Sequence, residues 1–240
     1  MCRVHGREDR SLRRATVGFG RTASRASLVG WGSGVGLVVI VAGLTFATRA
    51  HELPLRPFVA SAAKIASGQL WVVPASALIV DRPVLIGLAA FGVLAVTTLR
   101  VCGARTFWLA AAMGHVGSTF LVYGIIGSTR LADPHMFTRA VVTPDFGVSA
   151  MQGAWVGALT ATAWSRAGTD HRHRALVAAG VCALAGVGWL LHPDPSILTT
   201  EHLFAFFIGC GIVSWRRLAA AGTEASRRLV RQRRNAAQHA

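Results

Sequence analysis

Six apolar runs, each of roughly the length needed to cross a lipid bilayer, constrain the fold of this chain more than any other feature. A helix needs about 20 residues, within a range of about 17–25, to span the hydrocarbon core of a membrane. The backbone finds no water there, so such a segment satisfies its own hydrogen bonds as a helix. The runs are residues 28–47, 84–99, 106–127, 146–164, 175–191 and 197–215. We therefore predict an all-α polytopic membrane protein with six transmembrane helices.

The second of these runs is short, and the residue at which its helix begins is open. Residues 71–80 form a further apolar piece, which Asp81, Arg82 and Pro83 separate from the run. This piece either extends the second span or lies in the membrane interface.

The basic residues predict the orientation of the helices. The chain carries 25 Lys and Arg residues and a net charge of +15. If both termini are cytoplasmic, 19 of these 25 residues fall in cytoplasmic segments, as the positive-inside rule requires. The arginines flank the apolar runs instead of forming one patch with interleaved aromatic residues, so we expect membrane lipids and not nucleic acid as partners. Lys64 is the only lysine, and this Arg- and Ala-rich composition suggests a GC-rich bacterial genome and hence a bacterial plasma membrane.

The first run is predicted to be a retained helix, because its 20 residues exceed the 7–15 of a signal-peptide core. The predicted organisation is a basic cytoplasmic tail over residues 1–27, a six-helix membrane domain over 28–218 and a basic cytoplasmic tail over 219–240. Glycines within the runs are interpreted as faces of close helix packing. They include Gly32, Gly34, Gly36, Gly153, Gly157, Gly209 and Gly211.

Two polar residues stand at equal depth in the fourth and sixth runs. Both runs enter the membrane from the outer face, and Ser149 lies about five residues after Pro144, or about 7–8 Å along a helix. His202 reaches a similar depth if its helix begins near Pro195 or Ser196. Because a serine hydroxyl becomes a good nucleophile when a neutral imidazole within about 3 Å takes its proton, this pair meets the first requirement for acyl transfer.

The residues around this pair resemble the signatures of rhomboid intramembrane serine proteases. Gly147-Val148-Ser149-Ala150 resembles their Gly-x-Ser-x motif, and His202-x-x-Ala205-x-x-x-Gly209 resembles their sixth-helix motif, with Ala205 replacing a glycine. Weaker resemblances occur at residues 67–71 and 100–105, and the whole similarity covers about residues 28–218. It implies a rhomboid-like helical bundle that cleaves peptide bonds in or near the transmembrane helices of substrates.

The resemblance also implies a role for each site residue. Ser149 would be the nucleophile, His202 the base and then the acid, and Gly147 would serve the oxyanion site or local packing. No metal or cofactor is implied.

The sequence departs from the family in the groups that hold the oxyanion. Family proteases carry a His and an Asn on the second helix, whereas residues 83–90 are apolar here, and the first-loop Trp-Arg pair is Trp71-Val72. The oxyanion would then depend on backbone N–H groups such as that of Ser149. His115 and Thr119 imitate the missing pair but lie on the third run. A non-catalytic rhomboid-like protein that binds client helices is therefore the alternative, and a small-molecule transporter a more distant one.

Each polar residue also has a structural explanation. A serine hydroxyl within a membrane helix often bonds to a carbonyl of its own helix, which would explain Ser149. His202 would be explained as a residue at the membrane interface. His115 is expected to hydrogen-bond between helices. Glu201 should point about 100° away from His202, and Asp145 is explained by a helix N-terminus, where negative charge is favourable.

Overall fold

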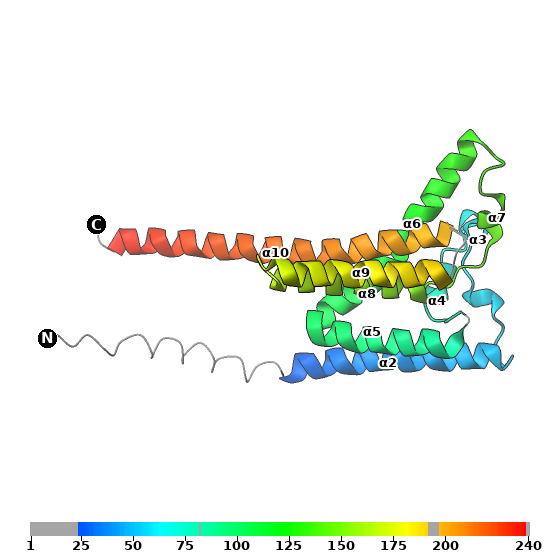
Figure 1. Ribbon diagram of the computed structural model, residues 1–240, viewed down its shortest axis with the longest axis horizontal. Helices are drawn as coiled ribbons and strands as arrows, with labels where there is room; N and C mark the ends of the chain where they lie inside the picture. Colours follow the sequence, from blue (N-terminus) through cyan, green and yellow to red (C-terminus); the bar gives the residue numbers. More distant parts are fainter. Residues whose placement is uncertain (1–23, 82, 192–196, 239–240) are drawn as a thin grey trace.

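The fold is that of a computed structural model, which describes residues 24–81, 83–191 and 197–238 (Figure 1). Side chains are described for all of these except residues 24–27, 182–191, 197–198, 228–234 and 236–238. The long helices are α2 (Ser24–Arg49), α5 (Val84–Cys102), α6 (Ala104–Ala132), α8 (Val148–Arg166), α9 (His171–Leu191) and α10 (Ile197–Gln238). Short helices occupy the connections: η1 (Arg56–Phe58), α3 (Ala62–Ala66), α4 (Val72–Ser76) and α7 (Thr138–Val142). Residues 1–23, which make up most of the predicted N-terminal tail, and Pro195 and Ser196 lie outside the described residues.

Four helices contain segments long and apolar enough to cross a membrane. These segments are Leu28–Arg49, Val84–Cys102, Ala104–Ala132 and Thr199–Arg227. Large apolar side chains such as Leu85, Val93 and Phe207 are exposed on their outer faces, where a soluble protein would carry polar groups. The prediction of an all-helical membrane protein is confirmed to this extent, whereas the predicted count of six crossings is not established.

Helix α8 is not among these four segments, and its position explains its more polar composition. It contacts α5, α6 and α10, so most of one face is enclosed by protein. Trp155 of α8 is fully buried; it stacks on Phe107 at 4.7 Å between ring centroids, and Phe91 lies tilted against it at 5.1 Å. Its indole N–H donates to the carbonyl of Phe107 at 3.1 Å. These rings form the centre of the core that joins α5, α6 and α8.

Close backbone packing joins α8 to α10, the most extensive contact between two helices in the described structure. A methyl group added to Gly157 would overlap the backbone of Phe206, and one added to Gly209 would overlap the backbone of Ala154. The packing role predicted for these two glycines is confirmed. The same holds for Gly34 and Gly153, but Gly32, Gly36 and Gly211 have open space where a side chain would stand, so the prediction is wrong for them.

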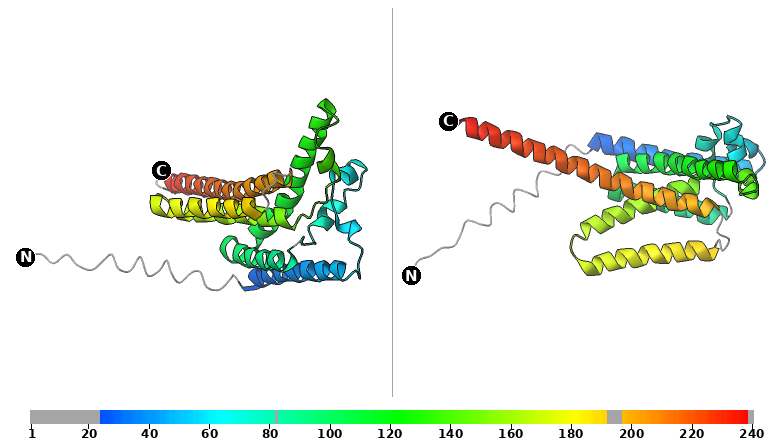
Figure 2. Two further views of the ribbon diagram at one scale, coloured as in Figure 1. Left: turned by 45° about the vertical axis from the view of Figure 1, so that its right-hand side comes forward. Right: turned by 90° about the horizontal axis from the view of Figure 1, so that it is seen from above.

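The two ends of the bundle differ in character. Figures 1 and 2 show α3, α4 and α7 gathered at the end where α8 and α10 begin, whereas the turn between α5 and α6 lies at the opposite end. Arginines cluster at that opposite end. The Arg100 guanidinium lies over the Trp31 ring, 5.6 Å from its centroid, and Arg166 donates to the carbonyl of Val101 at 3.0 Å. Arg100 and Arg166 therefore lie at the end opposite the connecting helices, whereas Arg49 and Arg56 lie near those helices.

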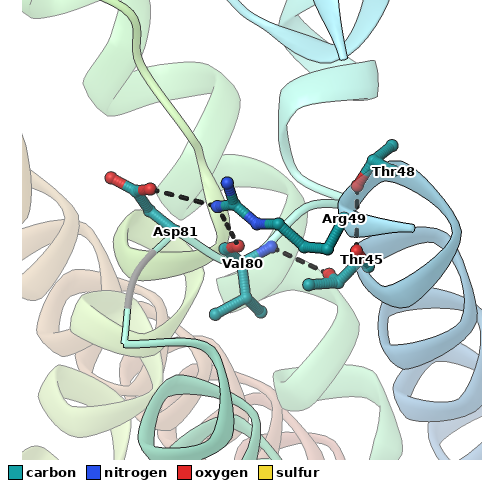
Figure 3. A network of polar contacts seen from close by, with 5 residues as sticks. All are labelled: Thr45, Thr48, Arg49, Val80 and Asp81. Atoms are coloured by element: carbon teal, nitrogen blue, oxygen red, sulfur yellow. Dashed lines mark hydrogen bonds and ion pairs between the residues drawn. The ribbon is translucent and has the colours of Figure 1, made fainter. Parts of the chain in front are cut away.

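The apolar piece at residues 71–80 is a separate element and does not extend the second span. It contains α4, whose Val72, Val73 and Ser76 are buried, and α5 begins only at Val84. Figure 3 shows how its end is fastened to α2: the Val80 N–H donates to the Thr45 hydroxyl at 3.0 Å, and Arg49 donates to the Val80 carbonyl at 3.4 Å and to Asp81 at 3.3 Å. The first of the two alternatives for this piece is therefore wrong.

Two predicted boundaries also differ from the structure. Residues 146 and 147 precede α8, and the Gly147 N–H donates to the carbonyl of Ser76 in α4. The boundary between residues 218 and 219 falls inside α10, which continues as one helix to Gln238 (Figure 1).

Candidate functional site

The site is built where α8 and α10 begin, and its centre is a serine and a histidine from these two helices. His202 Nε2 lies 2.8 Å from Ser149 Oγ, and both side chains are half-buried. The structure thus brings together the two residues singled out by the sequence, which are 53 positions apart. Ser149 Oγ also lies 3.3 Å from the carbonyl oxygen of Phe146. Because a hydroxyl has one proton, it donates either to the imidazole or to that carbonyl.

Small residues allow the two helices to approach closely enough for this contact. Gly153 lies one turn beyond Ser149 on the same face of α8. A methyl group at Gly153 would stand 3.1 Å from the carbonyl oxygen of His202. The backbone of the first turns of α10 therefore rests directly on α8, and the imidazole reaches the hydroxyl without a long side chain.

The start of α8 places Ser149 among unpaired N–H groups. Ser149 is the second residue of the helix, and the first N–H groups of an α-helix have no carbonyl one turn back. The positive end of the helix dipole also lies there. Such donors can stabilise negative charge that develops on a carbonyl oxygen attacked by Ser149.

Gly147 immediately precedes this helix, and its contacts favour packing over an oxyanion role. Its N–H donates to the carbonyl of Ser76 at 3.1 Å and is therefore already engaged. A methyl group on Gly147 would overlap the imidazole ring of His115. Of the two roles considered for Gly147, the described geometry matches the packing role.

His115 lies against the turn that carries the serine, which the sequence did not reveal. It is buried on α6, and its Nε2 lies 2.6 Å from the carbonyl of Val73 and 3.4 Å from the hydroxyl of Ser76. Its partners belong to α4, so the expected hydrogen bond between helices is confirmed. Among the described residues, its Nδ1 has no hydrogen-bond partner. The fold of residues 72–80 back against α6 creates this contact, and no local sequence pattern signals it.

Two buried carboxyl groups flank the serine–histidine pair in sequence and bind α6 in space. Asp145 accepts a hydrogen bond from the Tyr123 hydroxyl at 3.0 Å, and its backbone pairs with Ala60. It lies two residues before Gly147, the N-cap of α8, and the bond from Tyr123 gives its carboxyl group a partner beyond the helix N-terminus. Glu201 accepts from the hydroxyls of Thr119 at 2.7 Å and Ser118 at 3.3 Å. As expected, it points away from the Ser149–His202 contact.

We also searched the described residues for a metal site and compared the chain with known proteins. Within the described ranges, no three His, Cys, Asp or Glu side chains gather as a metal-binding group. Comparisons with protein-family models, with curated proteins and with solved structures gave no match. The geometry can therefore be interpreted only through its own chemistry: a hydroxyl, an imidazole and helix N–H groups within reach of one another.

Proposed function

We propose that this chain is a rhomboid-like membrane protein that hydrolyses peptide bonds in or near the transmembrane helices of its substrates. The observation that carries the proposal is the 2.8 Å contact between Ser149 Oγ and His202 Nε2 at the start of two adjacent helices. The order and spacing of the Gly147–Ser149 and His202–Gly209 motifs support it. So does the half-buried position of this contact between apolar helices.

The proposed topology has six crossings in a bacterial plasma membrane, with both termini cytoplasmic. α8 is enclosed by its neighbours, so its lower hydropathy is compatible with a span that has little contact with lipid. α9 has 21 residues, which is enough to cross. The arginines at the end of the bundle opposite the serine favour that end as the cytoplasmic one. The serine–histidine pair would then lie near the outer surface.

The proposed reaction proceeds through an acyl-enzyme. Ser149 Oγ attacks the carbonyl carbon of the scissile bond while its proton passes to His202 Nε2. N–H groups of the first turn of α8 stabilise the oxyanion. The carbon–nitrogen bond then breaks, and the leaving amine takes the proton from His202. A water molecule, deprotonated by His202, attacks the ester, and its collapse returns the proton to Ser149.

A non-catalytic protein that binds client helices is the second candidate. The observation that favours it is the apolar first turn of α5, which offers no side-chain donor to an oxyanion. The contact of Ser149 with the carbonyl of Phe146 also gives its hydroxyl a structural use.

Labelling by a fluorophosphonate probe separates the two candidates. We expect the full chain in detergent or liposomes to be labelled, and Ser149→Ala to abolish labelling because it removes the attacking oxygen. Ser214→Ala is the matched control, since that hydroxyl is exposed on α10 and bonds only to the Cys210 carbonyl of its own helix. An unlabelled wild-type chain, under conditions in which a known rhomboid protease reacts, would overturn the hydrolase and favour the client-binding protein.

A further inference from the structure

Side chains on one face of α6 form hydrogen bonds with three different segments around the site. His115, Thr119 and Tyr123 are spaced one helical turn apart and therefore lie in a row. His115 binds the carbonyl of Val73 in α4 at 2.6 Å, Thr119 binds Glu201 of α10 at 2.7 Å, and Tyr123 binds Asp145 before α8 at 3.0 Å. The helix that carries neither Ser149 nor His202 thus contacts both of the segments that do.

Glu201 is the member of this set that stands next to the imidazole. Its side chain is fully buried at 1% exposure, and it accepts hydrogen bonds from two α6 hydroxyls. Buried polar groups are strongly driven to keep such partners, because an unpaired one loses its hydration without compensation. The carboxyl group therefore ties the first turns of α10 to Ser118 and Thr119.

This tie fixes the direction in which the next residue points. Consecutive side chains on an α-helix are about 100° apart, so a helix that holds Glu201 against α6 must turn His202 toward a different neighbour. That neighbour is α8, where Ser149 stands. The contact through Gly153, Gly157 and Gly209 sets the distance between α8 and α10, and the hydrogen bonds of Glu201 to α6 add a constraint on the rotation of α10.

We infer that Glu201 is a positioning residue: its carboxyl group, held by Thr119 and Ser118, sets the rotation and depth of the first turns of α10 and so aims the His202 imidazole at the Ser149 hydroxyl. Glu201 does not act on the imidazole directly, because its carboxyl group is bound to α6. The labelling test of this inference rests on the proposed function. The geometric part, that Glu201 sets the position of His202 relative to Ser149, does not depend on hydrolysis.

The first test compares three variants by their rate of fluorophosphonate labelling. Glu201→Ala removes the tie, and a misplacement of about 1 Å can cost about 10²-fold, so we expect slower labelling by a factor of roughly 10–100. Glu201→Gln keeps an oxygen that accepts from Thr119 and should restore most of the rate. Thr119→Val should slow labelling, and its combination with Glu201→Ala should be no worse than Glu201→Ala alone, since both remove the same tie.

The matched control is Thr106→Ala, in the first turn of α6 and far along the α6–α10 contact from Glu201. The Thr106 hydroxyl of α6 accepts a hydrogen bond from Arg216 of α10. Its loss loosens the α6–α10 contact far from the serine and should leave the labelling rate near that of the wild type. If Thr106→Ala slowed labelling as much as Glu201→Ala, or if Gln were no better than Ala at position 201, the positioning role would be overturned.

A second readout is independent of hydrolysis. Cysteines introduced by Ser149→Cys and His202→Cys, in a chain whose four native cysteines are replaced by alanine, should be joined by a short thiol-specific crosslinker. Adding Glu201→Ala should lower the crosslinked yield, whereas adding Thr106→Ala should not. If the wild-type chain resists the fluorophosphonate but the yield depends on Glu201, hydrolysis fails and positioning stands. A yield unaffected by Glu201→Ala would overturn positioning and leave the hydrolase untouched.

Discussion

The imidazole of His202 and the hydroxyl of Ser149 meet at 2.8 Å across the contact between α8 and α10, although they lie 53 positions apart with the whole of α9 between them. Both belong to the first two turns of their helices. The pair therefore lies at one end of the bundle, half-buried, where helix N–H groups point toward the same space.

Removal of the imidazole should slow the proposed reaction without unfolding the chain. A positioned general base typically contributes about 10²–10⁴-fold, so His202→Ala should lower the labelling rate by a factor in that range. The comparison is His135→Ala, whose side chain is exposed in the connection before α7. Labelling rates measured on purified protein in liposomes check this prediction, and equal rates for the two variants would contradict a base role for His202.

Enlargement of Gly157 should separate α8 from α10. The added methyl group would overlap the backbone of Phe206, and overpacking of this kind costs about 1–3 kcal/mol. Gly157→Ala should therefore lower the thermal unfolding temperature in detergent and slow fluorophosphonate labelling. Gly211→Ala is the control on the same pair of helices, because open space surrounds that position. It should be neutral or slightly stabilising, since alanine favours a helix by up to about 1 kcal/mol over glycine.

The contact between Gly147 and His115 should appear as an energetic coupling. Gly147→Ala forces a methyl group into the space of the imidazole ring, so it should destabilise the chain by about 1–3 kcal/mol. His115→Ala vacates that space at the cost of the hydrogen bond to Val73. The double variant should then cost less than the two single variants together, as residues in contact do. Additive losses of unfolding free energy would show that the two residues do not touch. Gly124→Ala, at an open position on α6, serves as the reference variant.

The turn before α9 should respond to acid through Asp170. The His173 side chain and backbone N–H, followed by the Arg172 N–H, hold the pKa of the Asp170 carboxyl below its ordinary value. A carboxyl with a lowered pKa stabilises the folded state above the ordinary value, and this contribution is lost as the pH falls through the lowered pKa. His173→Ala should therefore raise the pKa of Asp170, which a carbon-13 titration of the carboxyl measures. His171→Ala should leave it nearly unchanged, and an equal response to both variants would refute the assignment.

The long helices were predictable because each depends on a local property. A run of apolar residues long enough to cross a bilayer forms a helix whatever its neighbours are. α2, α5 and α6 follow these runs closely, whereas α10 begins with its run at residue 197 and continues past it to Gln238. Ser149 and His202 could also be singled out from the sequence, since polar groups in apolar runs are rare and costly. α4 was not predicted as a separate helix, because its burial depends on contacts with η1 and α6.

The sequence by itself determined the helical class, the position of the long helices and the two residues that form the central contact. Only the tertiary structure decided that Glu201 and Asp145 are fastened to α6, that His115 lies against Gly147, and that the segment before α5 turns back into the bundle. The physical reason is that these hydrogen bonds join residues 22–82 positions apart. Local composition fixes which segments become helices, but the partners of their buried polar groups are chosen only when the helices pack.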